Sequence, residues 1–125
     1  MARILVIDDE PHTRAMLEQI LKRAGYEVVL AADGREGMER YRRSPADLVI
    51  TDLYMPNQDG MDTIRELRLC FPRVAIIAMT GRPGTGTMLS IAQNATDVGI
   101  LRKPFLPDEL IAAVEKALGG KSPAQ

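Results

Sequence analysis

Five short apolar runs, rich in Val, Ile and Leu, recur along the chain with almost no alternation between apolar and polar positions. A strand of this kind is buried on both faces, as in a parallel sheet that is covered by helices on both sides. The runs predict five strands, at residues 3–7, 26–30, 48–51, 74–79 and 99–102.

Between these runs lie segments in which apolar residues recur every three or four positions, the spacing of an amphipathic helix. The clearest are Leu17, Ile20, Leu21 and Ala24, then Ile64, Leu67 and Leu69, then Leu110, Ile111, Val114 and Leu118. A further helix is expected at 87–95, a segment without any charged residue. Part of that helix is expected to face a partner.

Turn and capping residues stand where these helices should begin and end. Gly25 follows the first helix, Asp33 precedes the second, Asp59 precedes the third and Pro107 opens the last. The alternation predicts an α/β fold with five βα units, in which a doubly wound, five-stranded parallel sheet carries helices on both faces.

The chain has 125 residues, which is the usual size of one domain. We expect this domain to span residues 1–119, with a flexible tail or the start of a linker at 120–125. The 16 basic and 17 acidic side chains give a net charge of −1, which offers no overall attraction to nucleic acid or to an anionic membrane. The opening apolar run at residues 1–7 is too short for a signal peptide or a membrane span, so neither is expected. The single cysteine, Cys70, cannot form an internal disulfide and is expected to pack at a helix end. These features favour a cytoplasmic protein.

Polar residues follow four of the five predicted strands at their carboxyl ends. Asp8 and Asp9 follow the first strand, Asp52 the third, Thr80 the fourth and Lys103 the fifth. In an open parallel sheet these ends meet in one crevice, so the five side chains are expected to lie together. Each one alone could be a helix cap or a loop residue, but adjacent aspartates and a third acid at strand ends are hard to explain as caps.

Three carboxylates in one crevice repel one another and require a compensating cation. Oxygen ligands with room for water suit Mg²⁺, whereas one Cys and one His offer no zinc cluster. Lys103 supplies a second positive charge. A carboxylate beside Mg²⁺ and a lysine can act as a nucleophile toward phosphorus, which makes Asp52 the candidate acceptor of a phosphoryl group. Thr80 could donate a hydrogen bond to that group.

Four motifs, taken in order and spacing, resemble those of the response-regulator receiver domain over essentially the whole chain. They are Ile-Leu-Val-Ile-Asp-Asp-Glu at 4–10, Asp-Leu-Tyr-Met-Pro-Asn-Gln-Asp-Gly at 52–60, Met-Thr-Gly at 79–81 and Lys-Pro-Phe at 103–105. The resemblance implies a flavodoxin-like fold with strand order 2-1-3-4-5. It also implies a phosphorylation-dependent signalling switch.

According to this resemblance, Asp52 takes a phosphoryl group from a phosphohistidine of a sensor histidine kinase or a histidine phosphotransfer protein. The receiver catalyses the transfer and its own dephosphorylation without being a turnover enzyme. The metal is Mg²⁺, with Mn²⁺ as an alternative. Its direct ligands would be Asp9, Asp52 and the backbone carbonyl of Tyr54, while Asp8 would hold metal-bound water.

Further roles follow from the same resemblance. Thr80 and Lys103 would contact the phosphoryl oxygens, Lys103–Pro104 can be a cis peptide, and the small Gly81 would leave the phosphoryl pocket open. The protein would signal to an unknown protein target, without direct contact to nucleic acid or membrane. A phosphorylation-dependent dimer is a further expectation.

The sequence departs from the family where an aromatic residue usually stands three residues before the lysine. Ile100 occupies that position. Isoleucine is β-branched and has few χ1 choices, so it is poorly suited to alternate between two side-chain positions of different exposure. The usual relay to the face of the fourth helix, fifth strand and fifth helix is therefore in doubt. We expect the coupling to run from Thr80 through the glycine-rich loop at 81–86 instead.

Two other functions fit parts of the sequence. A pseudo-receiver would act as an interaction module without being phosphorylated, although such proteins usually lack one of the acidic or lysine positions that are present here. A nucleotide-binding enzyme is suggested by the glycines at 81–86, which follow a strand as in a P-loop, but Thr87 stands where the phosphate-binding lysine is required.

Two groups of basic residues are assigned to the surface. His12 has no clustered ligands around it in the sequence, so it is expected to be an exposed residue near a docking face. The arginines at 35, 40, 42 and 43 are expected to form a solvated helix face rather than an anion-binding site.

Overall fold

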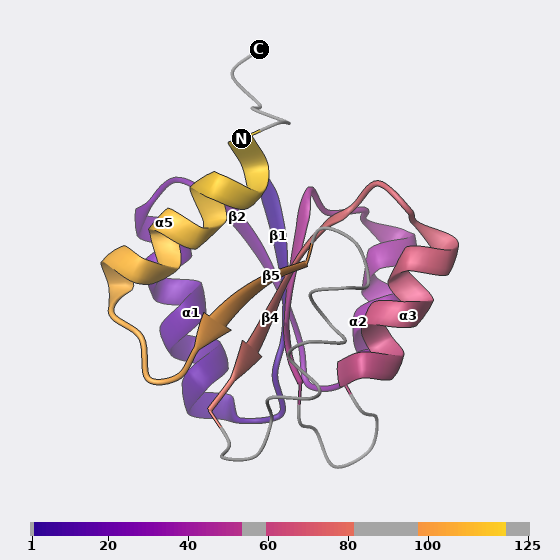
Figure 1. Cartoon of the computed structure of the whole chain (residues 1–125), viewed down its shortest axis with the longest axis horizontal. Helices are drawn as coiled ribbons and strands as arrows, with labels where there is room; N and C mark the ends of the chain where they lie inside the picture. Colours follow the sequence, from indigo (N-terminus) through magenta and orange to yellow (C-terminus); the bar gives the residue numbers. More distant parts are fainter. Residues whose placement is uncertain (1, 54–59, 82–97, 120–125) are drawn as a thin grey trace.

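The computed structural model describes residues 2–53, 60–81 and 98–119. Five parallel strands form one sheet in the order β2-β1-β3-β4-β5, as Figure 1 shows. The strands are β1 (Arg3–Ile7), β2 (Glu27–Ala31), β3 (Leu48–Asp52), β4 (Ala75–Thr80) and β5 (Val98–Arg102). Every bound lies within one residue of the prediction, and both the fold class and the strand order are confirmed.

The described helices cover both faces of the sheet (Figure 1). They are α1 (Pro11–Arg23), α2 (Gly34–Arg43), α3 (Gly60–Cys70) and α5 (Pro107–Leu118). α1 and α5 lie on one face, and α2 and α3 lie on the other. None of these helices combines the length and the apolar character that crossing a membrane requires. The predicted helix at 87–95 and the cap Asp59 lie outside the described residues.

Two apolar clusters, one on each face, hold the layers together. Leu5, Ile7 and Val49 belong to the cluster on the α2–α3 side, whereas Ile4 and Val6 belong to the cluster on the α1–α5 side. Successive residues of β1 thus enter opposite clusters, and this is why the strand sequence contains no polar alternation.

Local capping interactions place the helices as the sequence indicates. The Asp33 carboxylate accepts a hydrogen bond of 2.8 Å from the Glu36 N–H at the start of α2. Gly25 follows α1 with a φ of 96°, a left-handed conformation that glycine adopts at little cost. Pro107 begins α5, and the Glu109 carboxylate accepts a 2.7 Å hydrogen bond from the Leu106 N–H.

The end of α3 corrects two predictions. Leu69, which was expected to face the core, is 84% exposed, and Cys70, which was expected to pack, is exposed as well. Leu69 lies two residues after the buried Leu67, which at 3.6 residues per turn puts it roughly 200° around the helix. The inward position is taken instead by Phe71, whose ring centroid lies 4.3 Å from that of Tyr41.

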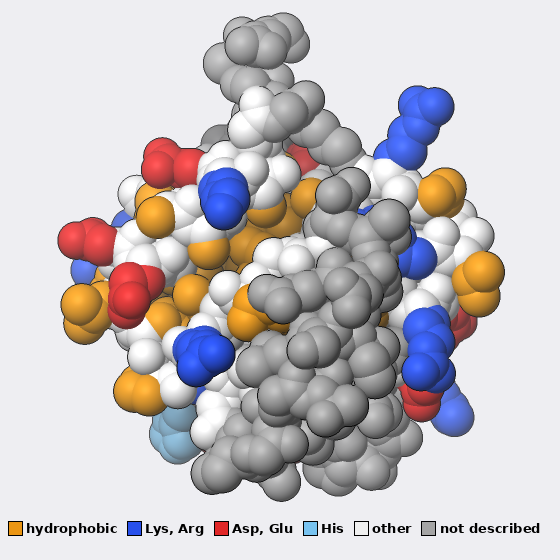
Figure 2. Space-filling view, viewed as in Figure 1, with side chains coloured by type: hydrophobic (Ala, Val, Ile, Leu, Met, Phe, Trp, Pro, Cys, Tyr) orange, Lys and Arg blue, Asp and Glu red, His pale blue; other side chains and the backbone are white. Residues whose placement is uncertain are grey.

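The predicted solvated arginine face on α2 is confirmed. Three of its four exposed arginines pair with carboxylates: Arg40 with Glu36 at 3.7 Å, Arg43 with Glu39 at 2.9 Å and Arg42 with Glu66 of α3 at 3.6 Å. Figure 2 shows basic side chains with acidic ones among them on the α2–α3 side of the molecule. Exposed pairs of this kind contribute little to stability, but they leave few of these charges for an anion.

Gly37 marks a close approach of α2 to the sheet. A Cβ atom at this position would overlap Cδ1 of Ile7 and would lie 2.8 Å from its Cγ1. Ile7 is fully buried, so it has little room to move away. The absence of a side chain at Gly37 therefore sets how closely α2 can lie against β1.

We predict that Gly37→Ala lowers the free energy of unfolding by about 1 kcal/mol. Overpacking against Ile7 costs ~1–3 kcal/mol, and the better helix propensity of alanine offsets up to ~1 kcal/mol of it. Urea denaturation measures the change. In an Ile7→Val background, which removes Cδ1, the cost of Gly37→Ala should shrink; an equal cost in both backgrounds would show that the overlap is not its cause.

Candidate functional site

The site lies at the carboxyl edge of the sheet, where the ends of β1, β3, β4 and β5 meet. Asp8 directly follows β1, Asp52 is the last residue of β3, Thr80 is the last residue of β4 and Lys103 directly follows β5. β1 and β3 are neighbours in the parallel sheet, with Ile7 opposite Thr51. The register therefore carries Asp8 and Asp52 to adjacent positions at one edge.

Three carboxylates form a tight acidic cluster at this edge. One oxygen from each of Asp8, Asp9 and Asp52 lies within 4.8 Å of the others. Asp8 is 0% exposed and Asp52 is 8% exposed, whereas Asp9 is exposed. The structure thus brings together the three acids that the sequence predicts, with two of them withdrawn from water.

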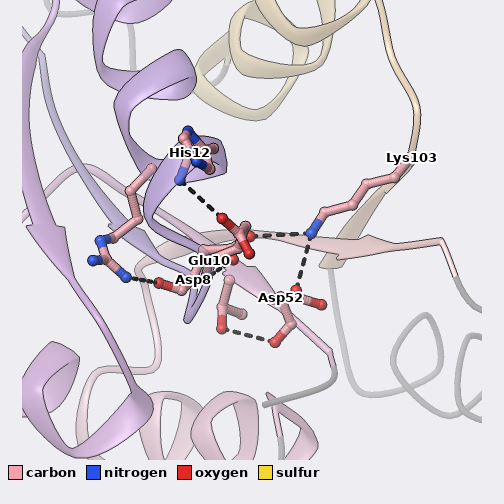
Figure 3. Close-up of polar contacts among 7 residues, drawn as sticks. Asp8, Glu10, His12, Asp52 and Lys103 are labelled. Atoms are coloured by element: carbon pink, nitrogen blue, oxygen red, sulfur yellow. Dashed lines mark hydrogen bonds and ion pairs between the residues drawn. The ribbon is translucent and has the colours of Figure 1, made fainter.

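Lys103 lies between the two buried acids. Its Nζ is 3.1 Å from Oδ2 of Asp8 and 3.0 Å from Oδ2 of Asp52 (Figure 3). Burial alone would lower the pKa of Lys103, but the hydrogen bonds and negative charges of Asp52 and Asp8 outweigh it, and the pKa is raised. The lysine is accordingly a fixed cation that partly offsets the charge of the cluster.

Asp8 is bound at each of its polar positions. Its N–H donates to the Ala31 carbonyl at 3.1 Å, its Oδ1 accepts from the Glu10 N–H at 2.8 Å, and its Oδ2 accepts from Lys103. Its carbonyl accepts from Nη1 of Arg14 at 2.6 Å. Burial raises the pKa of Asp8, while the Glu10 N–H and the charge of Lys103 oppose that rise.

The end of β4 approaches Lys103 through backbone contacts. The Lys103 N–H donates to the Thr80 carbonyl at 2.7 Å, and the Thr80 residue is buried. A Cβ atom on Gly81 would lie 3.0 Å from Cβ of Lys103, which is closer than most such contacts. Gly81 therefore makes room for the first carbon of the lysine side chain, a role that adds to its predicted effect of leaving the pocket open.

The remaining predicted residues divide between the described part of the chain and the rest. Ile100 is half-buried, lies opposite Ala78 in the β4–β5 register, and packs against the cluster on the α2–α3 side. His12 is exposed as expected, and the Lys103–Pro104 peptide is cis. Tyr54 and the loop at 82–86 lie outside the described residues.

Three residues of the site were not singled out from the sequence. Glu10 caps α1 by accepting from the His12 N–H at 3.1 Å, Arg14 donates to the Asp8 carbonyl, and the Thr51 hydroxyl donates to the Asp52 carbonyl at 3.2 Å. Arg14 had a recognisable signal. Side chains in the first turn of a helix point toward its N-terminus, and α1 begins directly beside the aspartates.

The donor set at this edge suits a hard divalent cation. The cluster offers carboxylate oxygens alone, one of its acids is exposed, and Cys70 lies at the far end of α3. Mg²⁺ is typically bound by a few carboxylates with several waters completing its shell, whereas zinc prefers sulfur and imidazole ligands. The residues present therefore fit Mg²⁺.

We predict that Lys103→Met lowers the free energy of unfolding at neutral pH by about 2 kcal/mol or more, because Asp8 and Asp52 would lose the cation between them. Burial raises the pKa of Asp8 and Lys103 opposes that rise, so without the lysine Asp8 would bind a proton more tightly in the folded state than in the unfolded state. Stability of the variant should consequently rise as the pH falls from neutral toward 5. Denaturation at several pH values measures this.

Lys116→Met is the matched control, because Lys116 is an exposed lysine of α5 outside the site. Its effect should be small and independent of pH. A loss in Lys103→Met that does not depend on pH would contradict the proposed charge balance.

Comparisons with known proteins agree with this geometry. Residues 4–115 match the family described as the response regulator receiver domain. The chemotaxis protein CheY of Thermotoga maritima is 36% identical over 115 residues, which cover 91% of this chain and 95% of that protein. The DNA-binding response regulator MtrA of Mycolicibacterium smegmatis is 35% identical over 117 residues, which are 93% of this chain but 50% of that protein.

Solved structures give the same result. A response regulator receiver domain protein from Clostridium thermocellum superimposes with a TM-score of 0.91 at 33% identity, covering 100% of both chains. The response regulator TrrA of Thermotoga maritima, solved in complex with Mg²⁺ and BeF, gives a TM-score of 0.84 at 36% identity, covering 94% of this chain and 100% of that one. On its fold, its acidic edge and its sequence, this chain belongs to the response regulator receiver domain family.

Proposed function

We propose that this receiver domain is a phosphorylation-dependent switch that accepts a phosphoryl group on Asp52. The observation that carries the proposal is the placement of Asp52, which is buried at the end of β3 with its carboxylate 3.0 Å from Nζ of Lys103. Asp8 and Asp9 lie in the same cluster of oxygens. A candidate nucleophile, a lysine countercharge and two further acids that could hold a metal ion thus share one crevice.

In the proposed reaction, a carboxylate oxygen of Asp52 attacks the phosphorus of a phosphohistidine on a sensor histidine kinase or a histidine phosphotransfer protein. The O–P bond forms while the P–N bond breaks, and the electron pair of that bond stays with the imidazole of the partner. Transfer of this kind depends on positioning and on neutralisation of the phosphoryl oxygens. The Lys103 ammonium and the Thr80 hydroxyl are the residues of this chain proposed to contact those oxygens.

Mg²⁺ is the proposed cofactor, with Mn²⁺ as an alternative, and when bound it would supply further positive charge to the phosphoryl oxygens. Asp9, Asp52 and the backbone carbonyl of Tyr54 are the proposed direct ligands, and Asp8 is proposed to hold metal-bound water. The structure of TrrA with Mg²⁺ and BeF supports this assignment by similarity. Asp9, the exposed acid of the cluster, is the one that a hydrated ion can reach first.

The proposed unit is the receiver domain at 1–119, with residues 120–125 as a tail or the start of a linker. We place it in the cytoplasm, as a protein that signals to an unknown protein target and that could dimerise when phosphorylated. The proposed response begins at Thr80 and Gly81, passes through the loop that follows β4, and reaches the face formed by the helix expected at 87–95, β5 and α5. Chemotaxis proteins of similar length and longer DNA-binding regulators are both among its relatives.

We predict that a small-molecule phosphodonor with Mg²⁺ labels the protein and that Asp52→Asn abolishes the label. An amide oxygen is too weak a nucleophile to replace the carboxylate. A base-labile label, quantified by mass spectrometry, measures the reaction. Asp62→Asn, which changes an exposed carboxylate of α3, is the matched control and should label like the parent. A base-labile label that persists on Asp52→Asn would refute the assignment.

We predict that Ile100→Ala lowers the free energy of unfolding by about 1–2 kcal/mol, because a half-buried isoleucine loses its packing, while leaving the switch response in place. With beryllofluoride and Mg²⁺, the amide resonances of Thr80 and Gly81 should shift alike in the parent and in the variant. Val114→Ala, in the cluster on the opposite face, is the packing control. Loss of the Thr80 shift in Ile100→Ala alone would mean that Ile100 transmits the response.

A further inference from the structure

Arg14 occupies an unusual place for a basic residue. It is the fourth residue of α1, whose first turn contains no acidic side chain. The N-terminus of a helix carries a partial positive charge, so a cation there is unfavourable for the helix itself. Helix stability therefore does not explain this residue, and its interactions beyond the helix have to be considered.

The Arg14 side chain reaches back across the start of α1 to the acidic edge. Its Nη1 donates a hydrogen bond of 2.6 Å to the backbone carbonyl of Asp8. That carbonyl belongs to the peptide group that joins Asp8 to Asp9. The guanidinium thus contacts the link between two acids of the cluster and not a carboxylate.

The two acids joined by this peptide are held very differently. The Asp8 carboxylate is fixed by the Glu10 N–H and by Lys103. In the described part of the chain, the exposed Asp9 side chain has no hydrogen bond or ion pair, so its position depends on its backbone. The orientation of the Asp8–Asp9 peptide consequently sets the point and the direction from which the Asp9 side chain extends toward Asp52, and so limits where its carboxylate can lie.

We infer that Arg14 is a positioning residue for the metal site, which it serves by fixing the Asp8–Asp9 peptide and with it the Asp9 carboxylate. The inference rests on the proposed function, because it concerns the Mg²⁺ that this function requires. Two effects of Arg14 on a bound cation oppose each other. Its charge repels the cation, whereas its hydrogen bond holds a ligand in place. The second effect is the larger one.

These two effects can be separated because Mg²⁺ and Ca²⁺ require different coordination geometries. Mg²⁺ requires near-ideal octahedral ligands at about 2.1 Å, whereas Ca²⁺ accepts flexible arrangements of six to eight oxygens. Loss of a positioning hydrogen bond should therefore weaken Mg²⁺ binding much more than Ca²⁺ binding. Loss of a repelling charge should strengthen the binding of both divalent ions by similar factors.

The test is calorimetric titration of Mg²⁺ and Ca²⁺ into the parent chain and three variants. Arg14→Gln should raise the Kd for Mg²⁺ at least about fivefold, which is about half of the smallest loss typical of groups that bind a metal ligand directly, and the Kd for Ca²⁺ about twofold or less. Arg14→Lys keeps the charge and one donor, so its Mg²⁺ affinity should fall between those of the parent and Arg14→Gln. The amide resonance of Asp9 should move in Arg14→Gln before any metal is added.

Arg23→Gln is the matched control. Arg23 is the exposed last residue of the same helix, nine positions and roughly 13 Å further along it. This variant should bind both ions like the parent. Melting of each variant without metal shows that it is folded before titration.

The remaining outcomes would contradict either the role of Arg14 or the proposed function. Mg²⁺ binding by Arg14→Gln that is tighter than or equal to that of the parent would overturn the inference, and so would equal losses for the two ions. Arg14→Lys binding no better than Arg14→Gln would overturn the role of the hydrogen bond. A parent chain that binds no Mg²⁺ would overturn the proposed function itself, whereas unchanged binding in the variants would leave that function standing and refute only the role of Arg14.

Discussion

The accumulation of negative charge at one edge of the sheet is the constraint on which the rest of this structure depends. Asp8 and Asp52 are almost fully buried, and a buried carboxylate is costly unless hydrogen bonds and a countercharge compensate it. Lys103 provides that countercharge from the other end of the chain, 95 residues from Asp8. One ammonium does not balance three carboxylates. A metal ion would compensate these acids directly, and with that ion bound the edge would hold the positive charge that an anionic phosphoryl group requires.

The parallel sheet makes such an edge possible. It also explains why the strands and the residues at their carboxyl ends were predictable from the sequence. A helix connects each strand to the next, so all strands run in the same direction. A polar residue that directly follows an apolar run therefore lies at the same edge of the sheet. Because the inner strands are buried on both faces, their runs define them to within one residue, as β1 and β4 show. The cap at Asp33 and the left-handed Gly25 were predictable for a local reason, since a few neighbouring residues determine each of them.

Two kinds of feature could not be predicted. One is the side of a helix on which a residue lies, and the other is the atom that a long side chain contacts. Leu69 is apolar, but its place on α3 depends on the helical phase set by Leu67, and a spacing of two residues puts it on the outer side. Cys70 follows it into solvent because Phe71 takes the inward place beside Tyr41. Arg14 could have been placed on α1 from the sequence. Its contact with a backbone carbonyl could not, because a long side chain has many rotamers and a carbonyl leaves no trace in the residue types.

The ends of β4 and β5 are tied to the site by the backbone rather than by an aromatic side chain. The Lys103 N–H is bound to the Thr80 carbonyl, and Gly81 permits the close approach of the two chain segments. Thr80 and Lys103 are also the residues proposed to contact the phosphoryl group, so a displacement of one could reach the other through this hydrogen bond. In the described sheet β5 pairs with β4 alone, and a strand that is bonded along one side can shift with less disruption than a central strand. In the proposed switch, Ile100 would move with β5 whatever its side chain does, so a receiver with isoleucine at this position could still present a changed β5 to a partner without a rotating aromatic ring.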